Sequence, residues 1–115
     1  MAMFDVRSTA ESDRVVVALS GECDLSVRDH VTKELLAALG RSSVVVVDLT
    51  SLVFMDSSGV HALVAAHHAA ERDGRRLYVV NAVGVVAELL DLTGIAELLR
   101  PPSVDGAAPS SAEES

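Results

Sequence analysis

Cysteine, aromatic and basic residues are scarce in this chain. Cys23 is the only cysteine among 115 residues, so the sequence excludes an internal disulfide and a cysteine-rich metal site. Tryptophan is absent, aromatic residues make up 3% of the chain, and the net charge is −8. Nucleic-acid binding normally requires a basic surface, and single strands also require aromatic side chains for stacking. We therefore expect no direct contact with DNA or RNA.

Long apolar runs are also missing. No stretch approaches the roughly 18 consecutive apolar residues of a membrane-spanning helix, and residues 1–8 lack the basic-then-apolar pattern of a signal peptide. We expect a soluble, cytoplasmic protein with no membrane partner. A chain of this length fits one domain with one core. Over residues 100–115 the composition shifts to Pro, Ser, Ala, Gly and Glu, which predicts a disordered acidic C-terminal tail.

The most informative stretch runs from residue 43 to residue 71. Four consecutive valines at 44–47 are too few for a helix and typical of a strand buried on both faces. Residues 58–73 carry apolar side chains at helical spacing. The first N–H groups of a helix have no partner within it, so Asp56, Ser57 or Ser58 should be the N-cap. A serine at this point can carry a phosphate, because the start of a helix favours negative charge.

Strands and helices are predicted to alternate along the chain. Strands are expected at 3–8, 14–20, 44–47 and 75–80, helices at 26–39, 58–73 and 82–92, and a short closing element at 96–100. The short connection between the first two strands favours an antiparallel hairpin, whereas helical crossovers require parallel strands. The sequence thus predicts an α/β fold: a mixed, mostly parallel sheet of four to five strands, with an antiparallel N-terminal edge strand and helices packed against it.

Local signals predict where several elements end. Residues 21–24 are expected to form a turn after the second strand. Ser26, with an aspartate three positions later, resembles the capping-box start of the first helix, and Gly40 is expected just after the end of that helix. Asn81 is the expected N-cap of the third helix.

Two polar segments are expected to lie close together. Residues 21–24 and 56–59 each lead from a strand into a helix. In an open α/β sheet, the loops at the carboxyl ends of the strands gather at one edge, where ligands usually bind. A simpler interpretation of Glu22 and Asp24 also stays open. Their negative charges could serve only to favour the start of the first helix.

The histidines of the second helix do not predict a metal site. His61 and His68 should face outward and His67 inward. Seven residues separate the outward pair, about 10 Å along a helix, which is too far for one metal ion. We expect a solvated histidine face, no metal and no cofactor. His61 lies one turn after Ser57 and could contact a bound partner or a phosphate.

A serine hydrolase is one alternative for this segment. Ser57, His61 and Asp56 are the residue types of such an active site. However, the G-x-S-x-G elbow that exposes a nucleophilic serine is absent, and no oxyanion pocket is indicated. We therefore expect no catalytic residues in this chain.

A family resemblance rests on VVDL at residues 46–49 and VFMDSSG at residues 53–59. Together they resemble the signature of STAS-domain anti-anti-sigma factors, the bacterial antagonists of anti-sigma factors. The resemblance implies a STAS domain over residues 3–99. It also implies that the anti-sigma factor, a serine kinase, phosphorylates Ser57, with Ser58 as the second choice. The unphosphorylated form would bind the kinase and release the sigma factor, and a PP2C-type phosphatase would reset the cycle.

The resemblance further implies a partner-binding edge. The G-E-x-D sequence at residues 21–24 recurs in the family close to the serine loop, which gives its acidic residues a role in partner binding. The implied partner-binding residues are Glu22, Asp24, Asp56, Ser57, Ser58, Gly59 and His61. The alternative within the same fold is a non-switching scaffold or adaptor subunit of a stress-sensing assembly or a lipid-transport complex.

Overall fold

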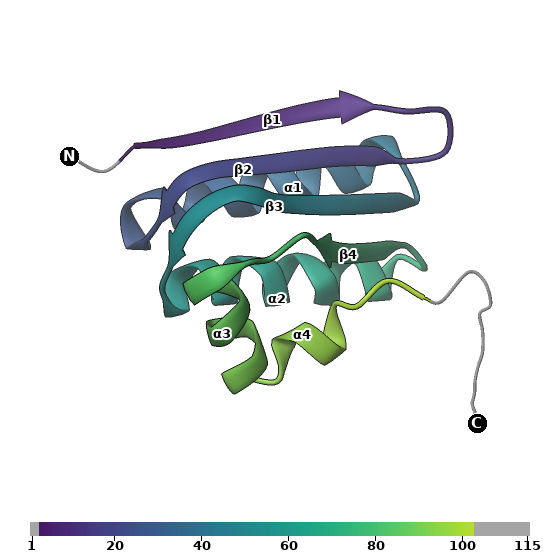
Figure 1. Cartoon of the computed structure of the whole chain (residues 1–115). Coiled ribbons are helices and arrows are strands. Elements are labelled where there is room, and N and C mark those ends of the chain that lie inside the picture. The colour runs from purple at the N-terminus through teal and green to yellow at the C-terminus, as the bar shows by residue number, and fades with distance from the viewer. Residues whose placement is uncertain (1–2, 103–115) are drawn as a thin grey trace, which may run out of the picture.

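The computed structural model describes residues 3–102 (Figure 1). In order, the elements are β1 (Phe4–Ala10), β2 (Val15–Cys23), the short 3₁₀ helix η1 (Leu25–Val27), α1 (Arg28–Arg41), β3 (Val44–Met55), α2 (Ser57–Arg72), β4 (Arg76–Val80), α3 (Gly84–Leu92) and α4 (Ile95–Leu98). The predicted closing element thus corresponds to α4. Most of the predicted tail, from residue 103 onward, lies outside the described residues. Within residues 3–102, every helix falls short of the length and apolarity that a bilayer crossing demands.

The four strands form one sheet in the order β1-β2-β3-β4. β1 is antiparallel to β2, whereas β2, β3 and β4 run parallel to one another. This arrangement confirms the predicted α/β fold with its antiparallel N-terminal edge strand. The carboxyl ends of β2, β3 and β4 lie at one edge of the sheet, on the left in Figure 1, which we call the carboxyl edge.

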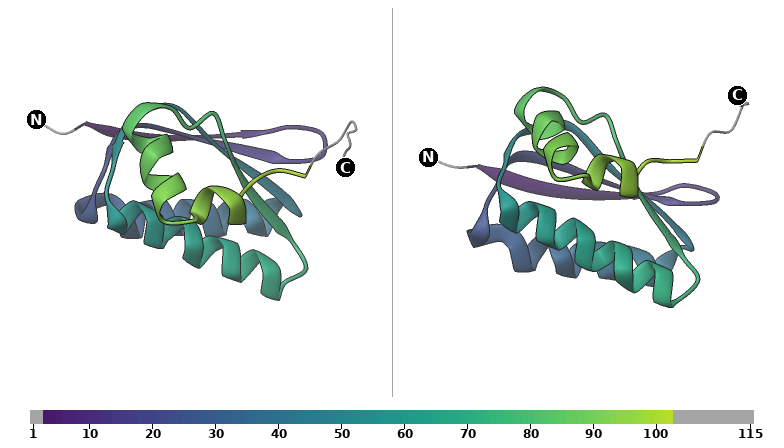
Figure 2. Two further views of the ribbon diagram at one scale, coloured as in Figure 1. Left: turned by 60° about the horizontal axis from the view of Figure 1, so that its bottom comes forward. Right: turned by 90° about the horizontal axis from the view of Figure 1, so that it is seen from below.

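Helices cover the sheet unequally. α1 and α2 lie side by side on one face, and α3 and α4 lie toward the other face, next to β3 and β4 (Figure 2). Val15, Val17 and Leu19 of β2 are at most 2% exposed, and the residues between them are half-buried. This alternation follows from the pleat of the strand, which directs successive side chains to opposite faces. Leu35 of α1 and Leu63 of α2 are fully buried, so one core holds both helices against the sheet.

The predicted turn at residues 21–24 is wrong, because β2 continues to Cys23. Gly21 has a φ of 88°, and a Cβ there would lie 1.9 Å from the carbonyl oxygen of Met3. Only glycine tolerates both this positive φ and so close an approach of the Met3 backbone. The register against β3 shifts after Gly21, and the N–H of Glu22 donates to the carbonyl of Met3 at 2.8 Å. The strand therefore bends at this irregularity and continues to the carboxyl edge.

Both predicted ends of the first helix are also wrong. Asp24 caps the preceding helix η1, because its carboxylate accepts a hydrogen bond from the N–H of Ser26 at 3.0 Å. The N-cap of α1 is Val27, not Ser26, and no side chain of the described residues caps this helix. The α-helix itself begins at Arg28, after η1. Gly40 lies inside α1, and the helix ends where the N–H of Ser42 donates to the carbonyl of Ala38.

Asn81 does not cap α3, which begins only at Gly84. The backbone of Asn81 is left-handed, with a φ of 63°. Its side-chain amide donates to the carboxylate of Asp48 on the neighbouring strand at 3.1 Å. Asparagine tolerates this conformation better than most residues, and the contact with Asp48 holds it outside the helix.

Candidate functional site

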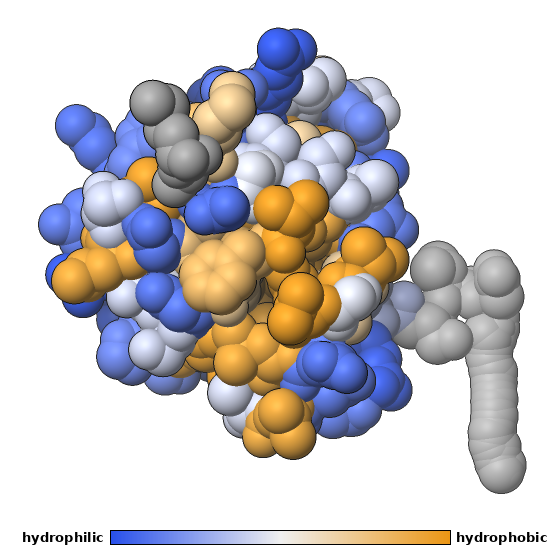
Figure 3. Space-filling model, turned by 60° about the vertical axis from the view of Figure 1, so that its left-hand side comes forward, coloured by the Kyte–Doolittle hydropathy of each residue, from blue (hydrophilic) through white to orange (hydrophobic). Residues whose placement is uncertain are grey.

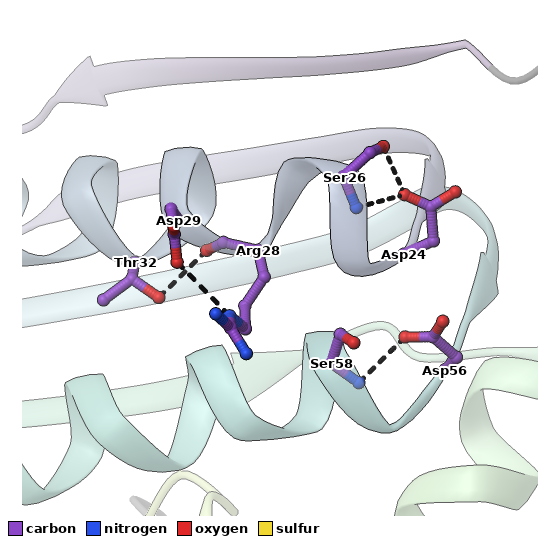
Figure 4. A network of polar contacts seen from close by, with 7 residues as sticks. All are labelled: Asp24, Ser26, Arg28, Asp29, Thr32, Asp56 and Ser58. Carbon is purple, nitrogen blue, oxygen red and sulfur yellow. Dashed lines mark hydrogen bonds and ion pairs between the residues drawn. The ribbon is translucent and has the colours of Figure 1, made fainter.

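Two aspartates cap neighbouring helices at the carboxyl edge. The carboxylate of Asp24 accepts from the N–H of Ser26 at 3.0 Å, and that of Asp56 accepts from the N–H of Ser58 at 2.8 Å. Figure 4 shows both carboxylates at the starts of their helices, η1 and α2. Each satisfies an N–H group that has no partner within its helix. The predicted N-cap of α2 is therefore confirmed, with Asp56 in that position.

A backbone hydrogen bond joins the two capping loops. The N–H of Asp56 donates to the carbonyl of Cys23 at 3.2 Å. The first turn of α2 also packs tightly at Gly59, where a Cβ would lie 2.6 Å from Cγ of Met55 and 3.0 Å from Sγ of Cys23. Any larger residue would have to displace the side chains of Met55 and Cys23 or the turn itself. The predicted meeting of the two polar segments is thus confirmed.

The two serines of the quartet differ in exposure. Ser57, the first residue of α2, is exposed, whereas Ser58 is half-buried. The N–H groups and the macrodipole of α2 favour an anion at this end of the helix. A phosphate on Ser57 would be reachable from solvent and would lie directly after the carboxylate of Asp56.

Glu22 and His61 are the other two residues predicted for this edge. Glu22 is half-buried at the end of β2, opposite Phe54 in the parallel register. His61 is exposed on α2. In the part of the chain that the structure describes, no hydrogen bond joins His61 to Ser57, so the nucleophile and base of a hydrolase are not paired. Nor do residues 3–102 contain a group of three His, Cys, Asp or Glu side chains arranged to hold a metal ion.

The carboxyl edge is acidic. Burial, followed by the charges of Asp56 and Asp24, raises the pKa of the Cys23 thiol to about 11. Cys23 is only 1% exposed and therefore remains a neutral core residue at physiological pH. Arg28 extends from α1 toward the first turn of α2 and pairs with Asp29 at 3.2 Å (Figure 4). Because the Arg28–Asp29 pair is neutral as a whole, the net charge beside the two capping aspartates stays negative.

An exposed apolar surface lies next to these polar groups. Its side chains are 42% to 63% exposed and come from the loops and element ends at the carboxyl edge. We call this set the edge surface: Leu25, Val53, Phe54, Val83 and Val85. Figure 3, viewed from this side, shows an apolar patch bordered by hydrophilic side chains. Such a patch on a small protein commonly marks a binding site for another protein.

The edge surface was not predicted from the sequence. The predicted strand covers residues 44–47, whereas β3 continues to Met55. One weak signal was available, since successive side chains of a strand point to opposite faces, so two adjacent apolar residues cannot both pack on the same layer of helices. Val53 and Phe54 are such a pair, and both are exposed.

Comparison with known proteins gives a consistent result. The model of the STAS domain matches residues 6–107. An anti-sigma F factor antagonist from Paenibacillus polymyxa is 30% identical over 87 residues, which make up 74% of this chain and 74% of that protein.

Solved structures with the same fold include two antagonists. An anti-sigma factor antagonist from Mycobacterium paratuberculosis has a TM-score of 0.77 and 21% identity, covering 90% of this chain and 89% of its own. The antagonist SpoIIAA in its unphosphorylated form has a TM-score of 0.71 and 20% identity, covering 90% of both chains. The phosphorylated form of SpoIIAA, a Bacillus cell fate determinant, has a TM-score of 0.66 and 20% identity, covering 90% and 93%. At these identities the likeness establishes a shared fold.

Proposed function

This chain belongs to the STAS-domain family, and we propose from that premise that it is an anti-sigma factor antagonist of the bacterial cytoplasm. Its unphosphorylated form binds an anti-sigma factor that is a serine kinase, and the kinase then releases its sigma factor. Phosphorylation of Ser57 ends this binding, and a PP2C-type phosphatase restores it. The chain catalyses no reaction itself.

The exposure of Ser57 at the start of α2 carries the proposal. A kinase must bring the γ-phosphate of ATP to the acceptor hydroxyl, so the acceptor has to be reachable by another protein. Ser57 is exposed, whereas Ser58 is half-buried and its N–H is bonded to the Asp56 cap. These facts favour Ser57 over its neighbour as the acceptor.

The chain supplies only a hydroxyl to the transfer. Oγ of Ser57 attacks the γ-phosphorus of kinase-bound ATP, the bond to the β,γ-bridging oxygen breaks, and ADP leaves. The hydroxyl proton passes to a base of the kinase. The kinase also holds the Mg²⁺ that neutralises the charge developing on the phosphates, so this chain needs no cofactor of its own.

The new charge explains release of the partner. A phosphate adds about −1.5 to −2 charges near neutral pH, directly beside Asp56 and close to Asp24. Docking would then bury a dianion among carboxylates, and desolvating unpaired charge costs several kcal/mol. A change of about 5.5 kcal/mol moves a two-state equilibrium from 1:99 to 99:1. Release therefore needs no refolding of the domain.

The edge surface supports docking at the same place. Protein interfaces commonly combine an apolar centre with a polar rim. Here Phe54 and Val53 lie just before the capping loop that ends in Asp56. A partner that covers these side chains would also cover Ser57, so docking and phosphorylation would be linked.

Mass spectrometry of the protein isolated from its native cell tests the proposal most directly, because it locates any phosphate. The companion experiment measures binding to the cognate kinase with and without ATP. Ser57→Ala should stay bound when ATP is added, and Ser57→Asp should bind weakly. Ser58→Ala tests the second choice. Ser43→Ala is the matched control, since Ser43 is exposed and immediately precedes β3, away from the carboxyl edge.

Two results would reject the switch. One is that Ser57→Ala and Ser57→Asp bind and dissociate like the parent. The other is that the phosphate is found on a residue away from the carboxyl edge. A chain that binds partners but is never phosphorylated would instead act as a STAS scaffold or adaptor subunit.

A further inference from the structure

A second site lies away from Ser57, where β4 begins. Here an open cavity of about 510 Å³ is lined by residues from the end of α2, the start of β4 and the region of α4 and the segment that follows it. That segment runs beside β4 in Figures 1 and 2, and the N–H of Val79 donates to the carbonyl of Leu99 at 2.9 Å. The backbone pairing holds the outer wall of the cavity in place. Its described lining includes neither the capping aspartates, nor Ser57, nor any residue of the edge surface.

The cavity is basic in a strongly acidic protein. The chain has nine Lys and Arg residues against 17 Asp and Glu residues, yet Arg75, Arg76 and Arg100 all line this one cavity. Among residues 3–102, Glu71 is the only carboxylate of the lining. Nη1 of Arg75 donates to the carbonyl of Leu39 at 2.9 Å, which orients its guanidinium group. Arg100 pairs with Glu97, and Arg76 is exposed at the first position of β4.

His67 gives an independent observation at the same cavity. Its side chain is 12% exposed and lines the cavity. Both ring nitrogens are buried without a hydrogen-bond partner among the described residues. Oε2 of Glu71 lies 3.5 Å from Nε2, too far for a good hydrogen bond. Buried polar atoms nearly always have partners, so an acceptor or donor brought by a ligand would satisfy this ring.

The other lining residues indicate what the ligand carries besides its charge. Leu77 and Leu98 contribute apolar surface, and Tyr78 contributes a half-buried aromatic ring. Guanidinium groups match the oxygens of a phosphate better than ammonium groups do, and the volume lies in the range of small-molecule sites. We propose that this cavity binds a phosphate monoester with a planar or apolar body, of the nucleoside monophosphate class, through Arg75, Arg76, Arg100 and His67.

Isothermal titration calorimetry of the full chain at low salt tests the site, with adenosine 5′-monophosphate, inorganic phosphate and adenosine as separate probes. The monophosphate should bind at least about tenfold more tightly than either fragment, because the charged and apolar parts each contribute. Arg76→Ala should weaken its binding about tenfold or more. Arg14→Ala removes the same charge outside the cavity, in the loop between β1 and β2, and should leave binding unchanged.

Amide NMR spectra then locate the ligand. On addition of the monophosphate, the signals of Gly74 and Leu77 should shift, and those of Ser57 and Gly59 should not. His67→Phe keeps the ring volume and removes the ring nitrogens, so it should weaken binding without unfolding the chain. The absence of binding by the monophosphate at millimolar concentration overturns the proposal. Equal affinity for inorganic phosphate, or equal losses in Arg14→Ala and Arg76→Ala, also overturns it.

Discussion

The backbone N–H of Asp56 donates to the carbonyl of Cys23, so the end of β2 is tied directly to the start of α2. The hydrogen bond is 3.2 Å long and joins residues from segments far apart in the sequence. As a result, Asp24 and Ser57 both lie at the carboxyl edge of the sheet. The exposed hydroxyl of Ser57 is thereby held at the start of a helix next to the carboxylates of the two capping aspartates.

Replacing Asp56 should separate the structural role of its side chain from its charge. Asp56→Ala removes the cap of α2 and should lower the free energy of unfolding by about 1 kcal/mol. Asp56→Asn keeps an oxygen that accepts from the N–H of Ser58 and should stay within about 0.5 kcal/mol of the parent. Urea unfolding monitored by circular dichroism measures both. Identical midpoints for Asp56→Ala and the parent would show that the cap does not stabilise the fold.

Gly59→Ala should destabilise the protein because the added Cβ has no room. It would lie 2.6 Å from Cγ of Met55 and 3.0 Å from Sγ of Cys23. Overpacking of this kind costs about 1 to 3 kcal/mol, and it should displace the first turn of α2 together with Ser57. Gly40→Ala in α1 is the matched control, since nothing lies within 4 Å of its Cβ.

The two glycine substitutions should have opposite signs. Alanine is favoured over glycine by about 0.5 to 1 kcal/mol inside a helix, so Gly40→Ala should stabilise the protein. Urea midpoints give both values. If the two variants shift the midpoint in the same direction, the tight approach of α2 to β2 is not what selects glycine at position 59.

Much of the fold was predictable because it depends on local spacing. The alternation of buried residues in β2 and the helical spacing in α2 follow from the geometry of single elements. The N-cap at Asp56 follows from the unpaired N–H groups of one helix. The exposure of Ser57 could likewise be expected from its position at a helix terminus.

The wrong predictions involve contacts between distant residues. β2 continues past Gly21 because the backbone of Met3, just before β1, accepts a hydrogen bond from Glu22. Asn81 does not start a helix because its amide donates to Asp48, 33 residues earlier. Nothing in the local sequence around either residue reveals such a contact. The basic cavity was missed for the same reason, since its arginines come from separate segments.

Cys23 should make the stability of the fold fall at alkaline pH. Burial and the nearby aspartates raise the pKa of its thiol to about 11, whereas the pKa of a cysteine in an unfolded chain is about 8.5. Because the pKa is higher in the folded state, the protonated thiol contributes to the stability of the fold. This contribution is complete below about pH 8.5 and is lost as the pH rises toward 11. Urea unfolding at several pH values should show the loss, and Cys23→Ala should abolish that part of it.

The same thiol should react slowly with Ellman's reagent in the native protein at pH 8. The thiolate is the reacting species, and Cys23 is 1% exposed. Reaction should become rapid in concentrated urea. Fast labelling of the native protein would contradict the buried position of Cys23 beneath the first turn of α2.

Phe54→Ala should weaken docking without weakening the fold. Phe54 is 42% exposed on the edge surface, beside the capping loop that leads to Ser57. Aromatic anchors at protein interfaces commonly contribute about 2 kcal/mol or more. The affinity of the kinase partner for unphosphorylated Phe54→Ala should therefore be about thirtyfold lower than for the unphosphorylated parent. Leu36→Ala is the control, because Leu36 is 44% exposed on α1 and lies outside the edge surface. Surface plasmon resonance against the kinase partner, with circular dichroism melts of each variant, separates binding from stability. If both variants bind like the parent, the partner does not dock on the edge surface. The charge next to Asp24 and Asp56 could then not explain release of the partner.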